Sequence, residues 1–368
     1  MRKQITRAIQ AAGMLLVAAS TALAQSPVPE GYPADYAELV KKAHEEGIVH
    51  LHSNMQTLTW KPILDGFMAK YPGITVEHLG LEDEMFERYL AEKAAGGTPA
   101  DVMVTSSVGK WVEFANRDEL VEYASPEIAN IPERARPMPG LFVMAEDAYA
   151  IAYNKMLFPE GKQPKSIADI AAYVEANPGA QVATYDPLRV ANGHAAWSAW
   201  LRHNGDAGWD LVTKIGPNFK GETTASQILD KVMTGEYAIA VNLVGTAVAR
   251  ILEKPGADTI LGAELIADGT PVIPRGMGIT KAGKHQNAAR LFVDYVLSNE
   301  GQVALAASYT PVRADVPAEA IKRGRPYASI AEAIGEDQIL QASFEEWVFK
   351  EYDDFAARWK KAMTGEKN

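Results

Sequence analysis

The sequence predicts an α/β protein of two lobes, joined by hinge strands, with a central ligand cleft between the lobes. Two series of alternating strands and helices carry this prediction, the first before residue 105 and the second after residue 166. A third segment, Pro271 to Val316, again combines a short apolar strand with an amphipathic helix. With 368 residues, the chain is long enough for two domains of ordinary size.

The first series is predicted to form lobe 1. It opens with a helix over 33–47, whose apolar residues share one face and which ends at Gly47. The elements that follow are a strand over 48–52, a helix over 60–71 ended by Pro72-Gly73, a strand over 74–79, a helix over 82–95 and a strand over 100–104. Strands that alternate with helices of this length predict a parallel sheet covered on both faces.

The second series is predicted to form lobe 2. A strand over 147–154 leaves lobe 1, and the chain returns near Pro271. Between them we expect a helix over 166–177, a strand over 181–185, a helix from His194, a helix over 225–233, a strand over 236–242 and a helix from Thr246. Two crossings between lobes give a hinge that can close on a ligand. The expected division is lobe 1 over 25–150 and 271–325, lobe 2 over 151–270, and a C-terminal helical tail over 326–368.

Residues 1–24 have the pattern of a cleaved signal peptide. Arg2, Lys3 and Arg7 precede an apolar run from Ala11 to Ala19, and Ala22-Leu-Ala24 is a small-x-small cleavage signal. The run is shorter than the ~20 residues that span a bilayer. We therefore expect an exported, periplasmic protein that starts near Gln25; a frayed amphipathic helix of a cytosolic protein is the alternative.

Composition excludes several classes of partner and site. The chain has no cysteine, so disulfides and thiolate metal sites are absent. Its formal net charge is −11, and removal of the three cations of the signal peptide makes it −14. Such a charge argues against nucleic acid and anionic membranes as partners, but a local pocket can still oppose the global sign and bind an anion.

The segment from Pro271 to Val316 also resembles a known family. It reads Pro-Val-Ile-Pro-Arg-Gly, then a helix that carries Ala288, Ala289, Leu291, Phe292, Tyr295 and Val296, then Glu300-Gly-Gln, and ends in Tyr309-Thr-Pro-Val-Arg-Ala-Asp-Val316. This order is similar to that of solute-binding proteins of ABC importers, in the branch of ferric-ion and sugar-phosphate binders. Tyr153-Asn154 and the stretch from Ile228 to Asn242 resemble the same branch.

The resemblance implies a two-lobed periplasmic binding protein of type II. Its partners would be a small-molecule ligand and an inner-membrane ABC permease with its ATPase, and we expect a monomer. A sensor that hands its closed form to a receptor is an alternative that the sequence does not separate from a transport receptor.

Four loops are candidates for the ligand site, because ligands of open α/β sheets sit beyond the carboxyl ends of strands, where helices begin. Their candidate residues are His52, Ser53, Asn54, Thr105, Ser106, Ser107, Tyr185, Asp186, Arg189, Asn192, Asn242 and Thr246. Helix N-termini leave backbone N–H groups without partners and bind anions readily. The alternative is that these hydroxyls and amides only cap helices.

Arg189 is the sharpest of these candidates. A guanidinium grips a carboxylate or phosphate in a fixed two-point geometry, although a surface salt bridge is the alternative. We expect Arg189→Ala to weaken binding at least tenfold, or about 1.4 kcal/mol. Asp186 could accept from ligand hydroxyls or stabilise the turn.

Metal and cofactor signals are weak, and we expect neither a metal site nor a cofactor. His50-x-His52 places two imidazoles on one strand face, but no third donor lies near in sequence. The resemblance implies adjacent tyrosines in iron binders where this chain has Leu243-Val244, and often an acidic ligand where it has Ser106-Ser107. We therefore expect a small anionic organic solute, phosphorylated or carboxylated, with ferric ion or a ferric chelate as the alternative.

No catalytic motif is present. The sequence lacks a Gly-x-Ser-x-Gly elbow, a His-Glu-x-x-His pair and a P-loop, and it nominates no nucleophile with a positioned base. We predict that the protein is not an enzyme; an exported hydrolase is the alternative from a different class.

Overall fold

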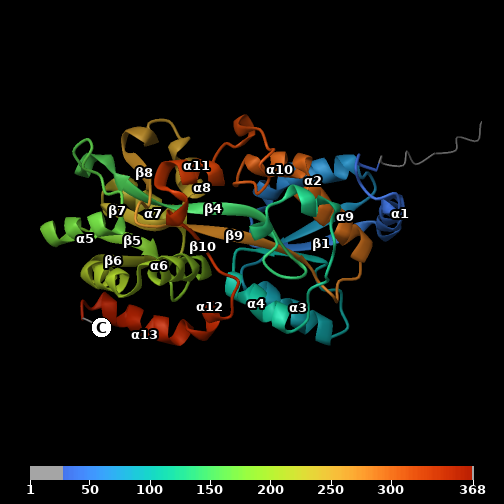
Figure 1. Ribbon diagram of the computed structural model, residues 1–368, viewed down its shortest axis with the longest axis horizontal. Helices are drawn as coiled ribbons and strands as arrows, with labels where there is room; N and C mark the ends of the chain where they lie inside the picture. Colours follow the sequence, from blue (N-terminus) through green and yellow to red (C-terminus); the bar gives the residue numbers. More distant parts are fainter. Residues whose placement is uncertain (1–27, 367–368) are drawn as a thin grey trace, which may run out of the picture.

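Two long strands, β4 (Leu141–Asn154) and β9 (Thr270–Ile279), cross the middle of the molecule and link its two lobes (Figure 1). The computed structural model describes residues 28–366, so the predicted signal peptide lies outside the described residues. Every residue of β4 and β9 is buried, which accounts for their apolar sequences. The structure thus has the two α/β lobes and the hinge strands that the sequence predicts.

Lobe 1 holds the first half of the chain and part of the return segment. Its elements are α1 (Tyr36–Glu46), β1 (Ile48–Ser53), α2 (Thr57–Lys70), β2 (Thr75–Gly80), α3 (Glu84–Ala94), β3 (Val102–Thr105), α4 (Val108–Asn116), α9 (Gln286–Leu297) and α10 (Asn299–Ala306). The apolar stripe of α9 packs on α1 and α2 in one core with Phe67 and Phe292, whose rings meet edge to face.

Lobe 2 lies at the other end of the hinge strands. Its elements are α5 (Ile167–Ala176), β5 (Val182–Tyr185), α6 (Ala191–Ile215), β6 (Phe219–Glu222), α7 (Ala225–Thr234), β7 (Ile239–Val244), α8 (Gly245–Leu252) and β8 (Leu261–Leu265). Helix α8 begins against the hinge: a Cβ at Gly245 would lie 2.8 Å from the carbonyl oxygen of Ala148. Only glycine lets the helix start so close to β4.

The strand order is β2-β1-β3-β9-β4-β7-β5-β6, with β8 beside β4 and β10 (Ile339–Gln341) beside β9. The pairs β1–β2, β1–β3, β5–β6 and β5–β7 are parallel, as predicted. The predicted parallel pairing holds within each lobe, whereas at the hinge β9 is antiparallel to β3 and β4, and β4 is antiparallel to β7. The hinge strands β4 and β9 run between the lobes in opposite directions, so they pair antiparallel with each other.

The C-terminal segment crosses the hinge a third time. It contains α11 (Tyr327–Ile334), then β10, which pairs with β9, then α12 (Trp347–Lys350) and α13 (Tyr352–Met363) (Figure 1). Helix α13 packs on α6, where the ring of Trp359 lies 5.1 Å from that of Trp197. The segment predicted as a helical tail therefore also contains a strand, and it forms part of the lobe 2 core. The predicted lobe boundaries themselves stay predictions.

Over residues 28–366, no helix is long and apolar enough to cross a membrane.

Candidate functional site

A cavity of about 230 Å³ lies between the lobes, against the hinge strands. Lobe 1 contributes Asn54 and Ser106, the hinge strands contribute Asp147 and Arg275, and lobe 2 contributes Asn192, Thr246 and Arg250. Small-molecule pockets usually measure about 300–1,000 Å³, so this cavity suits a small solute.

Arg275 and Asp147 form the charged centre of this cavity. Both lie on buried hinge strands, with 7% and 3% of their surface exposed. The Arg275 Nη1 donates to Asn54 Oδ1 at 2.5 Å, while its Nη2 lies 4.0 Å from Asp147 Oδ2. The guanidinium also stacks over the Tyr309 ring, 4.7 Å from its centroid. The Arg275 guanidinium therefore links Asn54 of lobe 1 to Asp147 of the hinge.

This centre retains unused hydrogen-bonding capacity. Asp147 Oδ1, Arg275 Nε and Asn192 Oδ1 are buried, and none has a partner among the described residues. Burial raises the pKa of the Asp147 carboxyl to about 6, although nearby Arg275 opposes the shift. Buried polar atoms without partners are costly, so their convergence on one cavity points to a polar ligand that pairs with them.

Two more arginines line the cavity. Arg250 on α8 is exposed, and no described residue forms an ion pair or hydrogen bond with it. Arg323 is held by Glu253, with bonds of 2.8 and 2.7 Å to its two carboxylate oxygens. The lining therefore contains three guanidinium groups and one carboxylate, that of Asp147.

Two tyrosines also line the cavity, and both are neutral in this setting. Burial raises the pKa of Tyr149 and of Tyr309 above its ordinary value. A third tyrosine, Tyr185, packs its ring 6.3 Å from that of Tyr149. These phenol groups can donate to a ligand oxygen; they can bind a metal only after losing a proton.

Four residues predicted for the site line the cavity: Asn54, Ser106, Asn192 and Thr246. They come from the ends of β1 and β3 in lobe 1 and from the starts of α6 and α8 in lobe 2. The structure thus brings together one residue from each of the four predicted loops. Their role in ligand binding stays a prediction.

The other predicted residues of lobe 1 do not line the cavity. Ser53 Oγ accepts from Trp60 Nε1 and from the backbone of Met55, both at 2.9 Å. Thr105 is fully buried and accepts from the backbone of Ser107. His52 is buried, and burial lowers the pKa of its imidazole to about 4, so the ring is neutral. Ser53 and Thr105 thus stabilise the loops from within, whereas His52 Nδ1 has no partner among the described residues.

Three of the remaining lobe 2 candidates, Tyr185, Asp186 and Asn242, also lie outside the cavity lining. Tyr185 is buried beside Tyr149, and Asp186 Oδ1 accepts from the backbone of Leu188 at 3.0 Å, which is the turn-stabilising alternative. Asn242 is fully buried with φ of 52°, and neither its Nδ2 nor its Oδ1 has a partner among the described residues. This strained position within β7 is unusual for a non-glycine residue.

Arg189 and Ser107 line a different groove, between α4 and the start of α6. Arg189 is exposed there, and the Ser107 hydroxyl donates to Asp83. Lys110 from α4 lines the same groove. The predicted arginine is therefore next to the cleft but outside its charged centre.

The sequence analysis missed Arg275, Asp147, Arg250 and Arg323. A signal was present for the first two: Arg275 is the one charged residue of β9, and Asp147 is one of two charged residues, with Glu146, in the largely apolar β4. A charge in a fully buried strand needs a partner, which is the usual mark of a functional group.

A larger hollow of about 570 Å³ lies on lobe 2, between α6 and the C-terminal helices. Its lining includes Trp209, Trp347 and Phe355, and it lies away from the hinge strands. It does not share the convergence of unpartnered polar atoms seen in the cleft, apart from His194 Nε2.

Comparison with known proteins identifies the family. Residues 63–325 match the family described as bacterial extracellular solute-binding protein. The chain is 27% identical over 297 residues to "Iron uptake protein A1" of Synechocystis sp., which covers 74% of this chain and 78% of that protein.

Two solved structures share the fold. The substrate-binding protein of an ABC transporter from Agrobacterium tumefaciens superposes with a TM-score of 0.74 at 22% identity, over 86% of this chain and 94% of that chain. The periplasmic binding protein AfuA from Actinobacillus pleuropneumoniae, with fructose-6-phosphate bound, superposes with a TM-score of 0.70 at 17% identity. The superposition covers 86% of this chain and 99% of that chain.

The family match, with the interlobe cavity, defines a bacterial extracellular solute-binding protein. The chain belongs to the bacterial extracellular solute-binding protein family, and its fold is the type II periplasmic binding fold that the sequence predicts.

Proposed function

We propose that this protein captures a small anionic organic solute, phosphorylated or carboxylated, in the cleft between its lobes. The observation that carries this proposal is the lining of the cavity, where Arg275 and Arg250 stand against the single carboxylate of Asp147, and a third arginine, Arg323, is paired with Glu253. Guanidinium groups bind carboxylates and phosphates in a two-point geometry. The locally cationic cleft opposes the negative charge of the chain.

Each part of the cleft has a role in this proposal. Arg275 and Arg250 take the anionic group, since Arg275 has a free Nε and Arg250 has no protein partner among the described residues. Asp147 Oδ1 and Asn192 Oδ1 accept from hydroxyl or amino groups of the solute. Asn54 and Ser106 complete the lobe 1 side, so the solute contacts both lobes and favours the closed form.

The proposed setting follows from the family. The signal peptide would direct the chain to the periplasm, where a monomer delivers its solute to an inner-membrane ABC permease with its ATPase. The reaction is recognition alone, without catalysis.

Ferric ion or a ferric chelate is the second candidate. The name of the relative from Synechocystis and the two tyrosines of the cavity favour it. Against bare ferric ion, β7 ends in Leu243-Val244 in place of adjacent tyrosines, and burial raises the pKa of the cavity phenols. A chelate with free carboxylates would still suit the arginines.

The test is a ligand screen by thermal unfolding, followed by calorimetry. The panel would contain sugar phosphates, phosphonates, small carboxylates, ferric ion and ferric citrate. A ligand at 100 times its dissociation constant adds about 2.7 kcal/mol of stability, which is readily detected. Stabilisation by organic anions without iron supports the proposal. A response to ferric ion alone contradicts it.

Arg275→Met and Arg189→Met form a matched pair of variants for the best ligand of the screen. Methionine keeps an apolar stem at each position and removes the charge. We expect Arg275→Met to weaken binding about 100-fold, or about 2.7 kcal/mol, because the buried guanidinium is the centre of the cavity. A greater loss with Arg189→Met would move the site to the groove beside α4.

A further inference from the structure

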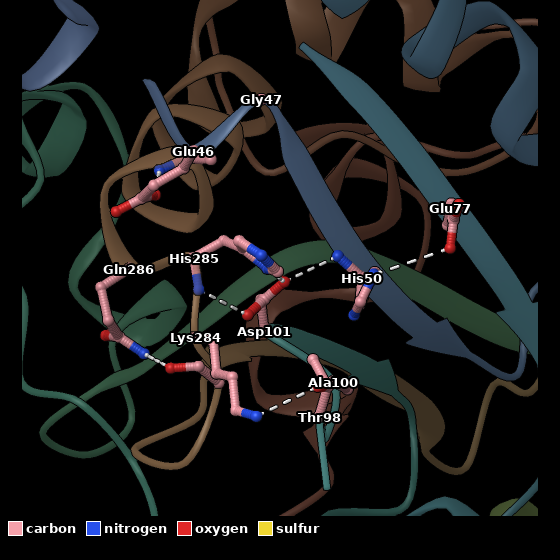
Figure 2. Close-up of polar contacts among 12 residues, drawn as sticks. Glu46, Gly47, His50, Glu77, Thr98, Ala100, Asp101, Lys284, His285 and Gln286 are labelled. Atoms are coloured by element: carbon pink, nitrogen blue, oxygen red, sulfur yellow. Dashed lines mark hydrogen bonds and ion pairs between the residues drawn. The ribbon is translucent and has the colours of Figure 1, made fainter. Parts of the chain in front are cut away.

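A cluster of two histidines and one aspartate lies on lobe 1, at the end of the sheet opposite to the cleft. It consists of His50 on β1, Asp101 just before β3 and His285 just before α9 (Figure 2). One possible ligand atom from each residue lies within 4.8 Å of those of the other two. Sequence inspection sees only His50, since Asp101 and His285 are remote in the chain.

The carboxylate of Asp101 is fixed from several sides. It is completely buried, and its Oδ2 accepts from the backbone N–H of His50 at 2.8 Å. Its Oδ1 accepts from the backbone N–H of His285 at 2.9 Å, and Oδ2 lies 2.9 Å from the His285 Nδ1 (Figure 2). The aspartate therefore positions one histidine by its ring and both by their backbones.

The imidazoles remain accessible and face each other. Their ring centroids are 5.2 Å apart, edge to face, and their side chains are 25% and 21% exposed. The His50 Nε2 lies 3.6 Å from Glu77 Oε2 on the neighbouring strand β2 (Figure 2). A carboxylate beside the second nitrogen of a histidine is the usual outer support of a metal-binding imidazole.

Helix capping does not explain the rings. The N-terminus of α9 is already capped by Glu46, whose carboxylate accepts from the backbone of Asn287 at 2.9 Å and of Ala288 at 2.7 Å. The bonds from Asp101 to the backbone of His50 and His285 would form with any residue at these positions. Neither imidazole is therefore needed to cap α9 or to hold the backbone bonds to Asp101.

We propose that His50, Asp101 and His285 bind a divalent transition-metal ion of the zinc class. Imidazole nitrogens with a carboxylate oxygen form the donor set that Zn²⁺ takes, with bonds of about 2.0–2.2 Å. The ion replaces the proton shared between His285 Nδ1 and Asp101 Oδ2, and that proton goes to solvent. The exposed rings close inward by rotation of their side chains, while the aspartate stays in place.

The proposed ion would join three separate parts of lobe 1. It would tie β1 and the segment before β3 to the return segment before α9. The site is independent of the proposed solute, because the cleft residues Asn54 and Ser106 lie at the opposite ends of β1 and β3.

The test is calorimetric titration of the chelator-treated, purified protein with ZnCl₂. We expect one Zn²⁺ per chain in the wild-type protein. His50→Phe keeps the edge-to-face ring contact and the backbone bond to Asp101 but removes both ring nitrogens, and it should weaken binding at least tenfold. His285→Gln keeps a side-chain donor for Asp101 and should have a similar effect.

Two controls separate this site from others. His203→Phe, at an exposed position on α6, should leave zinc binding unchanged, as should Arg275→Met in the cleft. Absence of zinc binding to the wild-type protein overturns the proposal. Wild-type affinity in either His50→Phe or His285→Gln also overturns it, because the proposed site requires both imidazoles.

Discussion

Two buried aspartates, Asp147 in the cleft and Asp294 in the lobe 1 core, have the same kind of environment but different sets of partners. Their exposed fractions are 3% and 1%, and burial raises the pKa of each carboxyl to about 6. Asp294 accepts from the hydroxyls of Tyr36 at 2.8 Å, Tyr123 at 2.6 Å and Ser125 at 2.5 Å. Asp147 has an oxygen without a partner and an arginine at 4.0 Å.

The comparison shows that burial alone does not mark a functional group. Both carboxyls have lost their water, so the shift in pKa has the same direction in each. What differs is hydrogen bonding: both oxygens of Asp294 accept from protein hydroxyls, whereas Asp147 Oδ1 has no partner among the described residues. Buried polar atoms without partners are therefore a better guide to a ligand site than burial alone, where several of them converge on one cavity.

The largest effect that would test this contrast is on stability. Asp294→Ala leaves the hydroxyls of Tyr36, Tyr123 and Ser125 buried without their acceptor, which should lower the free energy of unfolding by about 3 kcal/mol. Denaturant unfolding measures the loss. Solute affinity should not change, and a loss of affinity as large as the loss of stability would contradict the distinction.

A smaller effect is expected at Asp147, in the pH dependence of solute binding. Because the pKa of its carboxyl is about 6, the group is protonated at pH 5 and ionised at pH 7. Ionisation places a negative charge beside a bound anion, so affinity should fall as pH rises, by about tenfold or 1.4 kcal/mol.

Calorimetry at several pH values, with a carboxylated solute that is already ionised at pH 5, measures this slope. Asp147→Asn is the matched control, since the amide cannot titrate, and its binding should be nearly independent of pH. An unchanged slope in Asp147→Asn would assign the pH dependence to another group.

The smallest effect is expected from loss of one hydroxyl donor to Asp294. Tyr123→Phe keeps the ring and removes one hydroxyl, while Tyr36 and Ser125 still donate to Asp294. The free energy of unfolding should fall by about 1 kcal/mol. A loss equal to that of Asp294→Ala would show that the three bonds act as one unit.

Much of the fold could be predicted from the sequence because its elements carry strong periodic patterns. The helices α1, α2, α3, α5 and α7 lie within a few residues of their predicted ranges. Strands β6 and β8 and helix α4 were not predicted; β6 and β8 are only four and five residues long, and a short strand has little pattern to detect. The antiparallel hinge could not be derived from alternation of strands and helices.

The candidate site was predicted less well than the fold. Loop positions could be chosen from the ends of strands, but the direction of each side chain depends on packing. Ser53 and Asn54 are neighbours, yet the first accepts from Trp60 in the core and the second meets Arg275 in the cavity. Arg275 and Asp147 lie within strands, whereas the site was predicted only from the loops that follow strands.

The third crossing of the hinge has a mechanical consequence. Strand β10 pairs with β9, α12 touches lobe 1 through the bond of Asn116 Nδ2 to Glu346 Oε1 at 3.1 Å, and α13 packs on lobe 2. A rotation that moves the lobes apart must bend β4, β9 and β10. It must also stretch or break the contacts that α12 and α13 make with the two lobes. The C-terminal segment from α11 to α13 thus links the two lobes beside the hinge strands, and we expect it to resist opening of the cleft.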